Sequence, residues 1–180
     1  NAPRITASYA QNVHEKSNVD KDIQELMVTA GYGYGIGTMS LSNTVSFSMN
    51  KATSNTGEGL SYNIQNYLFN QLVSFQFPLS LSLNINHIRE DVMDSLTKRW
   101  ISDLSASFRL FEKVDMSLGG NYKVNTNDNE KIGGFAEVSY AFAGHFTFHL
   151  RFRNNYYDDY LNPTGSFDEY ILNGRLVINW

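Results

Sequence analysis

Residues Tyr170 to Trp180 read YILNGRLVINW, and alternate positions of this stretch differ in character. Leucine, isoleucine and one glycine occupy every second position between the two aromatic ends, whereas two asparagines and an arginine stand among the intervening residues. A repeat of two residues is typical of a β-strand, whose successive side chains point to opposite faces. The stretch therefore predicts a strand with one apolar face and one mostly polar face.

The same alternation recurs along the chain and is cleanest between Met39 and Met49, where apolar side chains alternate mostly with serine and threonine. No segment keeps the spacing of an amphipathic helix for more than a turn. We therefore predict an all-β fold of about ten antiparallel strands. Between Ile64 and Tyr67 the apolar positions change phase, which predicts a β-bulge near Gln65 and Asn66.

Composition limits the classes of protein that fit. The 180 residues suit a single domain, residues 1–180, and the absence of cysteine excludes disulfides and thiolate metal sites. A net charge of −4 argues against a nucleic-acid partner. No apolar run reaches the roughly 18 residues of a membrane helix, but a membrane barrel hides its lipid face in alternation.

The links between the expected strands alternate between polar segments, such as Ser17 to Asp22 and Tyr157 to Phe167, and tight turns, such as Phe77-Pro78. Long extracellular loops and short periplasmic turns are typical of outer-membrane barrels. The first and tenth strands run in opposite directions, so they could pair and close the sheet.

Closure leaves two barrels to distinguish, a soluble one with an apolar interior and a membrane one with an apolar exterior. Aromatic residues on the apolar face stand near strand ends, as an interfacial girdle requires, which favours the transmembrane β-barrel. The candidate girdle residues are Tyr34, Trp100, Phe142, Phe146, Tyr156, Tyr170 and Trp180.

The last strand resembles the C-terminal strand of bacterial outer-membrane β-barrel proteins, which alternates and ends in Phe or Trp. In that family the strand is read by the barrel assembly machinery, and the matching residues here are Tyr170, Leu172, Leu176, Ile178 and Trp180. The resemblance implies a bacterial outer-membrane location, periplasmic termini, and outer-membrane lipid and lipopolysaccharide as partners. The chain is then either a complete small barrel or the C-terminal part of a larger one, possible partners including other chains of an outer-membrane complex.

Charges gather on the polar face of the later strands, whereas the third to fifth strands offer mostly Ser, Thr and Asn. Glu137 is expected to pair with Arg151 or Arg153, because opposite charges on adjacent strands attract. The surplus of basic groups predicts a polar lumen with weak anion preference, or a wall against which a plug packs. The expected lumen charges are Arg99, Asp103, Arg109, Lys123, Glu137, Arg151, Arg153 and Arg175.

These features favour a non-enzymatic membrane module with no cofactor: a porin-like narrow pore, a translocon wall or an assembly partner. A binding protein or adhesin that uses its surface loops is the alternative. A third, weaker reading is an omptin-like rim hydrolase, because His87, Asp91, Asp94 and the pair Asp158-Asp159 fall near polar loops. No omptin motif matches residue by residue.

Three further patterns predict no site. The glycines from Gly31 to Gly35 precede a strand, whereas a nucleotide loop needs a helix, and we expect them to make room for large neighbours. His145 and His149 stand about 13 Å apart on an extended strand, too far to share a metal ion. The segment Asn127 to Glu130 lacks the glycine and spacing of a calcium loop.

Overall fold

The computed structural model describes residues 4–16, 19–54, 61–93, 95–111, 113–126, 128–142 and 145–178, with the backbone alone at residues 12–16, 19–21, 54 and 163. Within this part of the chain no helix is long and apolar enough to span a membrane. The elements are β1 (Arg4–Lys16), β2 (Val19–Ile36), β3 (Met39–Ser54), β4 (Tyr62–Phe75), β5 (Leu79–Val92), β6 (Ser95–Leu110), β7 (Val114–Asn125), β8 (Asn129–Phe142), β9 (Phe146–Asp159), the 3-10 turn η1 (Pro163–Gly165) and β10 (Phe167–Ile178).

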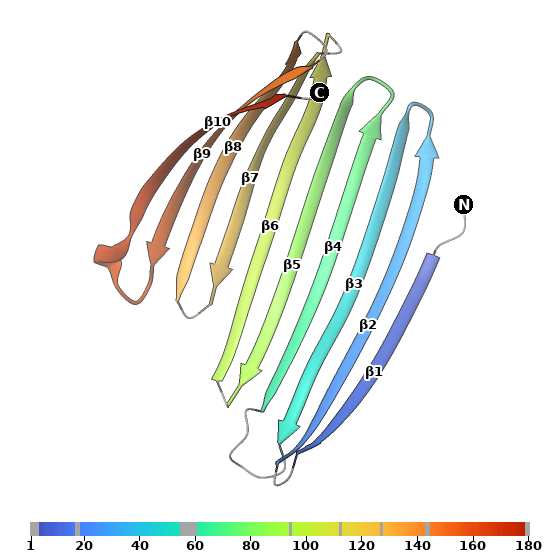
Figure 1. Ribbon diagram of the computed structural model, residues 1–180, viewed down its shortest axis with the longest axis vertical. Helices are drawn as coiled ribbons and strands as arrows, with labels where there is room; N and C mark the ends of the chain where they lie inside the picture. The colour runs from blue at the N-terminus through green and yellow to red at the C-terminus, as the bar shows by residue number, and fades with distance from the viewer. Residues whose placement is uncertain are drawn as a thin grey trace.

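The ten strands form one antiparallel sheet in chain order, so the all-β, ten-stranded prediction is confirmed. Figure 1 shows them side by side, with β1 and β10 at opposite edges. Within the described residues β1 pairs with β2 alone and β10 with β9 alone, so the expected pairing of the first and last strands is not formed. The chain thus forms a curved wall with two free edges.

The expected β-bulge in β4 is wrong. Pairing between β3 and β4 runs without interruption from Met39 opposite Phe75 to Ala52 opposite Tyr62. Ile64 therefore lies on the polar face, although its apolar side chain suggested the other one. The continuous ladder keeps every backbone hydrogen bond of the hairpin, and an apolar side chain near a strand end is a small cost beside a lost bond.

The alternation of long and short links is also wrong. The β5–β6 link has two residues and the β7–β8 link has three, so these expected loops are as short as the tight turns. Longer links join β3 to β4 and β9 to β10. Polar residues such as Asp91 and Glu130 belong to strands. Strand pairing satisfies backbone groups whatever the side chains, so polarity alone did not mark where a hairpin ends.

The sheet has no hydrophobic core of its own. Among the described residues, Ala52 is the one hydrophobic side chain that is buried, at 3% exposure. Large apolar side chains are exposed along the whole sheet, including Ile5, Leu104, Leu172 and Leu176. A soluble monomer rarely exposes a large continuous apolar surface. The apolar face therefore needs an apolar environment, which a lipid bilayer supplies.

Candidate functional site

Cross-strand pairing extends the two faces of β10 across all ten strands. Leu172 lies opposite Phe152, which lies opposite Ala136, and this row continues through apolar partners to Tyr34 on β2. The residues between them share the other face. We call these the apolar face and the polar face. The polar face carries all eight of the charged residues expected in the lumen.

Among the described residues, three ion pairs join neighbouring strands on the polar face. Arg99 pairs with Glu90, and the Arg109 guanidinium donates to Asp115 from Nε at 2.6 Å and from Nη2 at 3.3 Å. Of the two arginines expected to pair with Glu137, Arg151 does so, at 3.7 Å. Glu90 was expected in a polar loop, and its ion pair with Arg99 on the polar face was not predicted.

Other basic groups of the polar face have no carboxylate partner within the described residues. Arg153, Arg175 and Lys123 form no ion pair there. Glu169 lies one pleat from Arg153 on the polar face, but its carboxylate already accepts from Asn155 Nδ2 at 2.7 Å and from the Tyr157 hydroxyl at 3.4 Å. Glu169 is thus engaged by other groups, and Arg153 is left without a carboxylate partner among the described residues.

Lys123 adds to this surplus because it lies directly opposite another lysine, Lys131. Lys131 Nζ is placed over the ring of Tyr157, 4.7 Å from its centroid. Asp103, the remaining acid of the expected network, lies opposite Asn121 and is exposed. It forms no ion pair within the described residues.

Amide side chains form a second feature of the polar face. Asn155 is fully buried, and its Oδ1 and that of Asn121 have no hydrogen-bond partner within the described protein. Both oxygens point into the space above Gly133, which has no side chain. Unsatisfied buried acceptors are costly, so this surface suits contact with water or another hydrogen-bond donor.

Glycines on β7 and β8 allow neighbouring side chains to pack directly against the backbone. A Cβ on Gly119 would lie 2.5 Å from the Phe135 ring and 2.7 Å from the Leu104 carbonyl oxygen. The expectation that Gly31 to Gly35 make room for large neighbours is wrong, because a Cβ at Gly31 would meet its nearest atom at 3.8 Å. Those glycines face short serine and threonine side chains on β3.

Aromatic rings form a row across the apolar face of β3 to β6, where Phe47, Tyr67, His87 and Trp100 are paired in turn. Tyr67 packs against Phe47 with ring centroids 5.0 Å apart, and His87 stacks on Trp100 at 4.1 Å. Sequence analysis placed Trp100 in the girdle but missed the others. It also placed His87 near a polar loop, whereas the cross-strand register puts its ring between Tyr67 and Trp100.

The other expected girdle residues lie at both ends of the apolar face. Phe142 stacks on Phe146 with centroids 5.4 Å apart, and Tyr34 lies 5.5 Å from the Tyr32 ring. Tyr156 and Tyr170 are exposed at the loop end of β9 and β10. Tyr170, Leu172, Leu176 and Ile178, the residues of the expected assembly signal, line the apolar face of the edge strand β10, whereas Trp180 lies outside the described residues.

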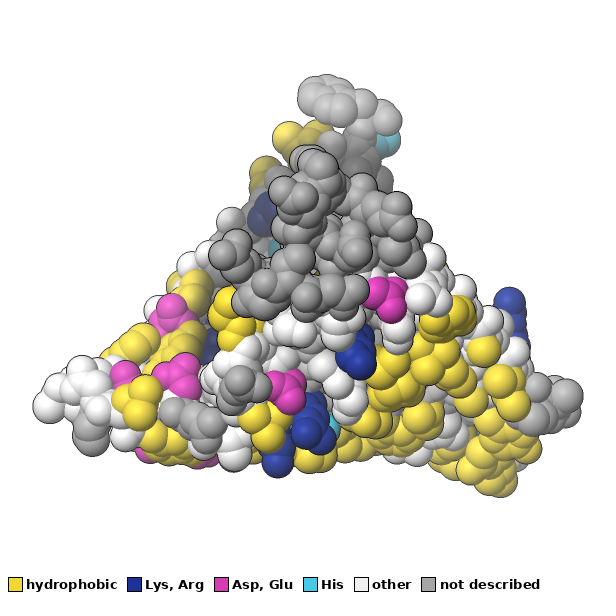
Figure 2. All heavy atoms as spheres, turned by 90° about the horizontal axis from the view of Figure 1, so that it is seen from below, with side chains coloured by type: hydrophobic (Ala, Val, Ile, Leu, Met, Phe, Trp, Pro, Cys, Tyr) yellow, Lys and Arg dark blue, Asp and Glu magenta, His cyan; other side chains and the backbone are white. Residues whose placement is uncertain are grey.

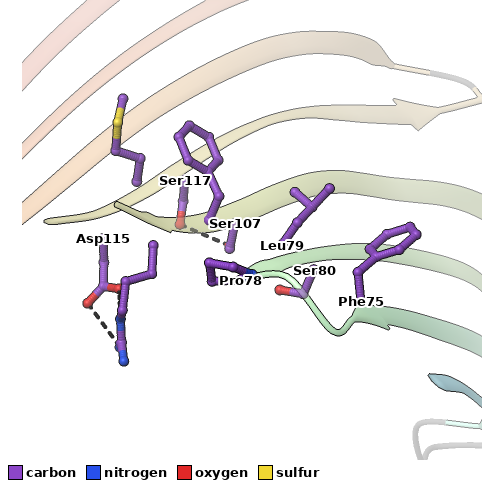
Figure 3. A pocket seen from close by; sticks show the side chains of 10 residues that line it. Phe75, Pro78, Leu79, Ser80, Ser107, Asp115 and Ser117 are labelled. Carbon is purple, nitrogen blue, oxygen red and sulfur yellow. Dashed lines mark hydrogen bonds and ion pairs between the residues drawn. The ribbon is translucent and has the colours of Figure 1, made fainter. Parts of the chain in front are cut away.

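A shallow pocket of about 390 Å³ lies at the tight-turn end of β4 to β7. Figure 3 shows Phe75 and Leu79 pointing to one side of the sheet there, and Ser80 and Asp115 to the other. Ser107 and Ser117 share a hydrogen bond of 3.0 Å. This end of the polar face is therefore held by short hydroxyl contacts and by the Asp115 ion pair.

The loop end of the sheet carries the residues of the hydrolase alternative, and they do not form a catalytic site. His87 is stacked between aromatic rings and, among the described residues, makes no hydrogen bond to a carboxylate that could orient it for base catalysis. Asp94 lies outside the described residues. Nor does the described part of the chain contain a cluster of three acidic or histidine side chains that could hold a metal ion.

At the same end, the Tyr160 hydroxyl donates to Glu130. This hydrogen bond, followed by burial of the phenol, raises the pKa of Tyr160 from 10.0 to about 12. Asp159 accepts from the backbone N–H groups of Leu161 and Asn162 at 3.0 and 2.9 Å, which orders the turn before η1. The β9–β10 hairpin tip is thus tied by local hydrogen bonds.

Figure 2 looks along the strands from this loop end. Visible acidic side chains lie toward the middle and toward the side of the C-terminal strands, whereas the side of the N-terminal strands shows one broad hydrophobic area. The acidic side chains visible in this view are therefore unevenly distributed.

No family model matches the chain, and no curated protein matches it. The chain is similar in structure to in-vitro folded OmpT, an outer membrane protein of Vibrio cholerae, with a TM-score of 0.53 and 10% identity over 94% of this chain and 62% of that one. The trimer form of the same protein gives 0.52. The β domain of the Bordetella autotransporter BrkA gives 0.44, at 11% identity over 97% of this chain and 81% of that one.

The chain spans less than two thirds of the length of OmpT, 62% of it. At 10% identity the similarity concerns the fold alone. Together with the ten antiparallel strands and the exposed apolar face, it shows that the chain has the fold of a bacterial outer-membrane β-barrel protein.

Proposed function

We propose that the polar face lines an aqueous, porin-like passage through the bacterial outer membrane, and that this passage favours small anions over cations. The observation that carries the proposal is the positive charge of Arg153, Arg175 and Lys123, which no ion pair neutralises among the described residues. A charge without a partner is very costly in a dry interior, so these groups require water or an anion.

The amide oxygens without partners support the same proposal. Asn50, Asn66, Asn86, Asn121 and Asn155 each present a buried Oδ1 that no described protein group satisfies. Water in a lumen would supply donors to all of them. A tightly packed protein plug would instead have to match each oxygen individually.

The free outer edges of β1 and β10 indicate that this sheet is one part of a wider barrel. Backbone groups on the outer edges of β1 and β10 lack strand partners within the described residues. In a bilayer such edges must be paired, because no water satisfies them. We therefore propose that further strands, from the same protein or from a partner chain, complete the barrel around the passage.

Ion selectivity in a planar bilayer tests the passage. With a salt gradient across the membrane, the protein should give a reversal potential that indicates anion preference. The double substitution Arg153→Glu with Arg175→Glu should reverse its sign, because fixed charge in a pore attracts counter-ions. Lys51→Glu is the matched control: Lys51 lies opposite Asn63 on the apolar face, so the selectivity should stay unchanged.

Cation preference in the unsubstituted protein would overturn the anion-selective passage. A protein that inserts into the bilayer yet conducts no ions would favour the plugged wall or the assembly partner instead.

Cysteine labelling tests the orientation, which we propose as periplasmic for both termini. The chain contains no cysteine, so single substitutions give unambiguous signals. An impermeant maleimide on intact cells should label Asn162→Cys, in the β9–β10 link, and spare Thr38→Cys, in the β2–β3 turn at the other end. Labelling of Thr38→Cys alone would reverse the orientation.

A further inference from the structure

Two cations face each other on the apolar side of the sheet, near the loop ends of β5 and β6. Arg89 and Lys98 are directly paired across these strands, and both side chains are exposed. Like charges opposite each other on adjacent strands destabilise a sheet. Within the described residues neither side chain forms an ion pair. The pair therefore holds positive charge that the described protein does not neutralise.

A mainly apolar groove of about 430 Å³ opens beside this pair, and Arg89 is one of its lining residues. The next paired residues toward the middle of the sheet on this face are His87 and Trp100, whose rings stack. The groove thus joins a cationic end to an apolar floor. The main apolar and aromatic lining residues are Val45, Phe47, Tyr67, Phe69, Ile85 and Trp100.

We propose that this groove and the Arg89–Lys98 pair bind a single lipid with a phosphate headgroup. The phosphate lies between the two cations, and an acyl chain lies along the apolar floor. Charge complementarity commits the site to an anionic headgroup: a phosphate removes the repulsion between the cations, and guanidinium binds phosphate with two parallel hydrogen bonds. Gln65 lies directly opposite Arg89 and can add an amide donor.

The position of the site on the sheet agrees with this occupant. Aromatic rings and basic side chains are both favoured where the hydrocarbon of a bilayer meets the headgroups. A soluble anion would use the cations but would have no need of the groove. The inference rests on the membrane placement proposed above, but it does not depend on conduction.

Fluorescence of Trp100 can test the proposal directly. The chain has two tryptophans, so Trp180→Phe leaves Trp100 as the single reporter within the groove while keeping an aromatic residue at position 180. Titrating diphosphoryl lipid A into the detergent-solubilised protein should give a saturable change in fluorescence. Arg89→Gln with Lys98→Gln should weaken the affinity about 30-fold, since each basic group near a lipid surface contributes about a factor of five.

The controls separate this site from other sources of binding. Arg153→Gln with Arg175→Gln removes the same charge from the polar face and should leave the affinity unchanged. Heat-modifiable migration shows whether each variant is folded, and Arg89→Gln alone serves if the double variant is not. The wild-type affinity should also fall as salt is raised.

Three results would overturn the lipid site. They are equal binding of phosphatidylcholine, saturation by inorganic phosphate alone, and an unchanged affinity in a folded Arg89→Gln variant. None of them bears on ion selectivity, and a protein without conductance can still bind the lipid, so this proposal and that of the passage can fail separately.

Discussion

Gly31 on β2 and Gly133 on β8 both lie on the polar face, but their surroundings differ. Gly31 lies between Thr44 on β3 and Arg4 on β1, and a Cβ there would have ordinary contacts. At Gly133 a Cβ would collide with the side chain of Asn155, which is fully buried. The wall is therefore open around Gly31 on β2 and crowded around Gly133 on β8.

The difference shows that the polar face of one sheet can carry two kinds of surface. Hydroxyl side chains on β2 and β3 satisfy one another locally, as Thr29 and Ser46 do at 3.0 Å. Longer side chains on β8 to β10 need partners on neighbouring strands, such as Glu137 for Arg151. The selectivity of the proposed passage thus depends on the C-terminal strands.

The largest expected effect comes from placing a charge on the apolar face. Leu83 lies on the apolar face, so Leu83→Arg should cost about 2–4 kcal/mol of folding stability if the site lies near the bilayer midplane. Ser82→Arg, one residue earlier, adds the same charge to the polar face and should cost clearly less. Urea titration of the protein refolded in lipid measures both, and a reversed order would place hydrocarbon on the polar side.

The next largest effect comes from adding a side chain at a glycine on β7. Gly119→Ala should cost about 1–3 kcal/mol, because the Phe135 ring and the Leu104 carbonyl oxygen leave no space for a methyl group. Gly31→Ala should be close to neutral by the same measurement. Equal costs at the two positions would remove the contrast between the two parts of the wall.

The ion pair of Arg109 and Asp115 should contribute little. Both side chains are more than half exposed, at 59% and 53%, and exposed pairs contribute about 0.2–1 kcal/mol. A double-mutant cycle with Arg109→Ala and Asp115→Ala measures the coupling, which should shrink further in high salt. A coupling of several kcal/mol would mean that this end of the wall is far less hydrated than its exposure indicates.

The smallest expected effect is a pH dependence at Tyr160, in the β9–β10 link. Because the folded pKa of Tyr160, about 12, lies above its ordinary value of 10.0, its hydrogen bond to Glu130 stabilises the fold below pH 10 and is lost as pH rises toward 12. Ultraviolet titration of phenolate should show a late-titrating group that disappears in Tyr160→Phe. Glu130→Gln should shift that titration back toward 10, and an unchanged curve in both variants would refute the assignment.

Periodicity of two residues determined the strand count, the face of nearly every residue and the apolar exterior, because a strand places successive side chains on opposite faces whatever lies around it. The terminal stretch from Tyr170 indicated the membrane class before any pairing was known. Alternation also placed Arg151, Arg153 and Arg175 on one face, from which the pairing of Glu137 was expected.

Pairing between strands decided the rest. The continuous ladder kept Ile64 on the polar face, extended β5 through Asp91, and brought His87 onto Trp100. It also set Arg89 against Lys98 and left the outer edges of β1 and β10 without strand partners among the described residues. These features depend on register, which backbone hydrogen bonds fix between distant segments, and the pattern within one strand does not contain that information.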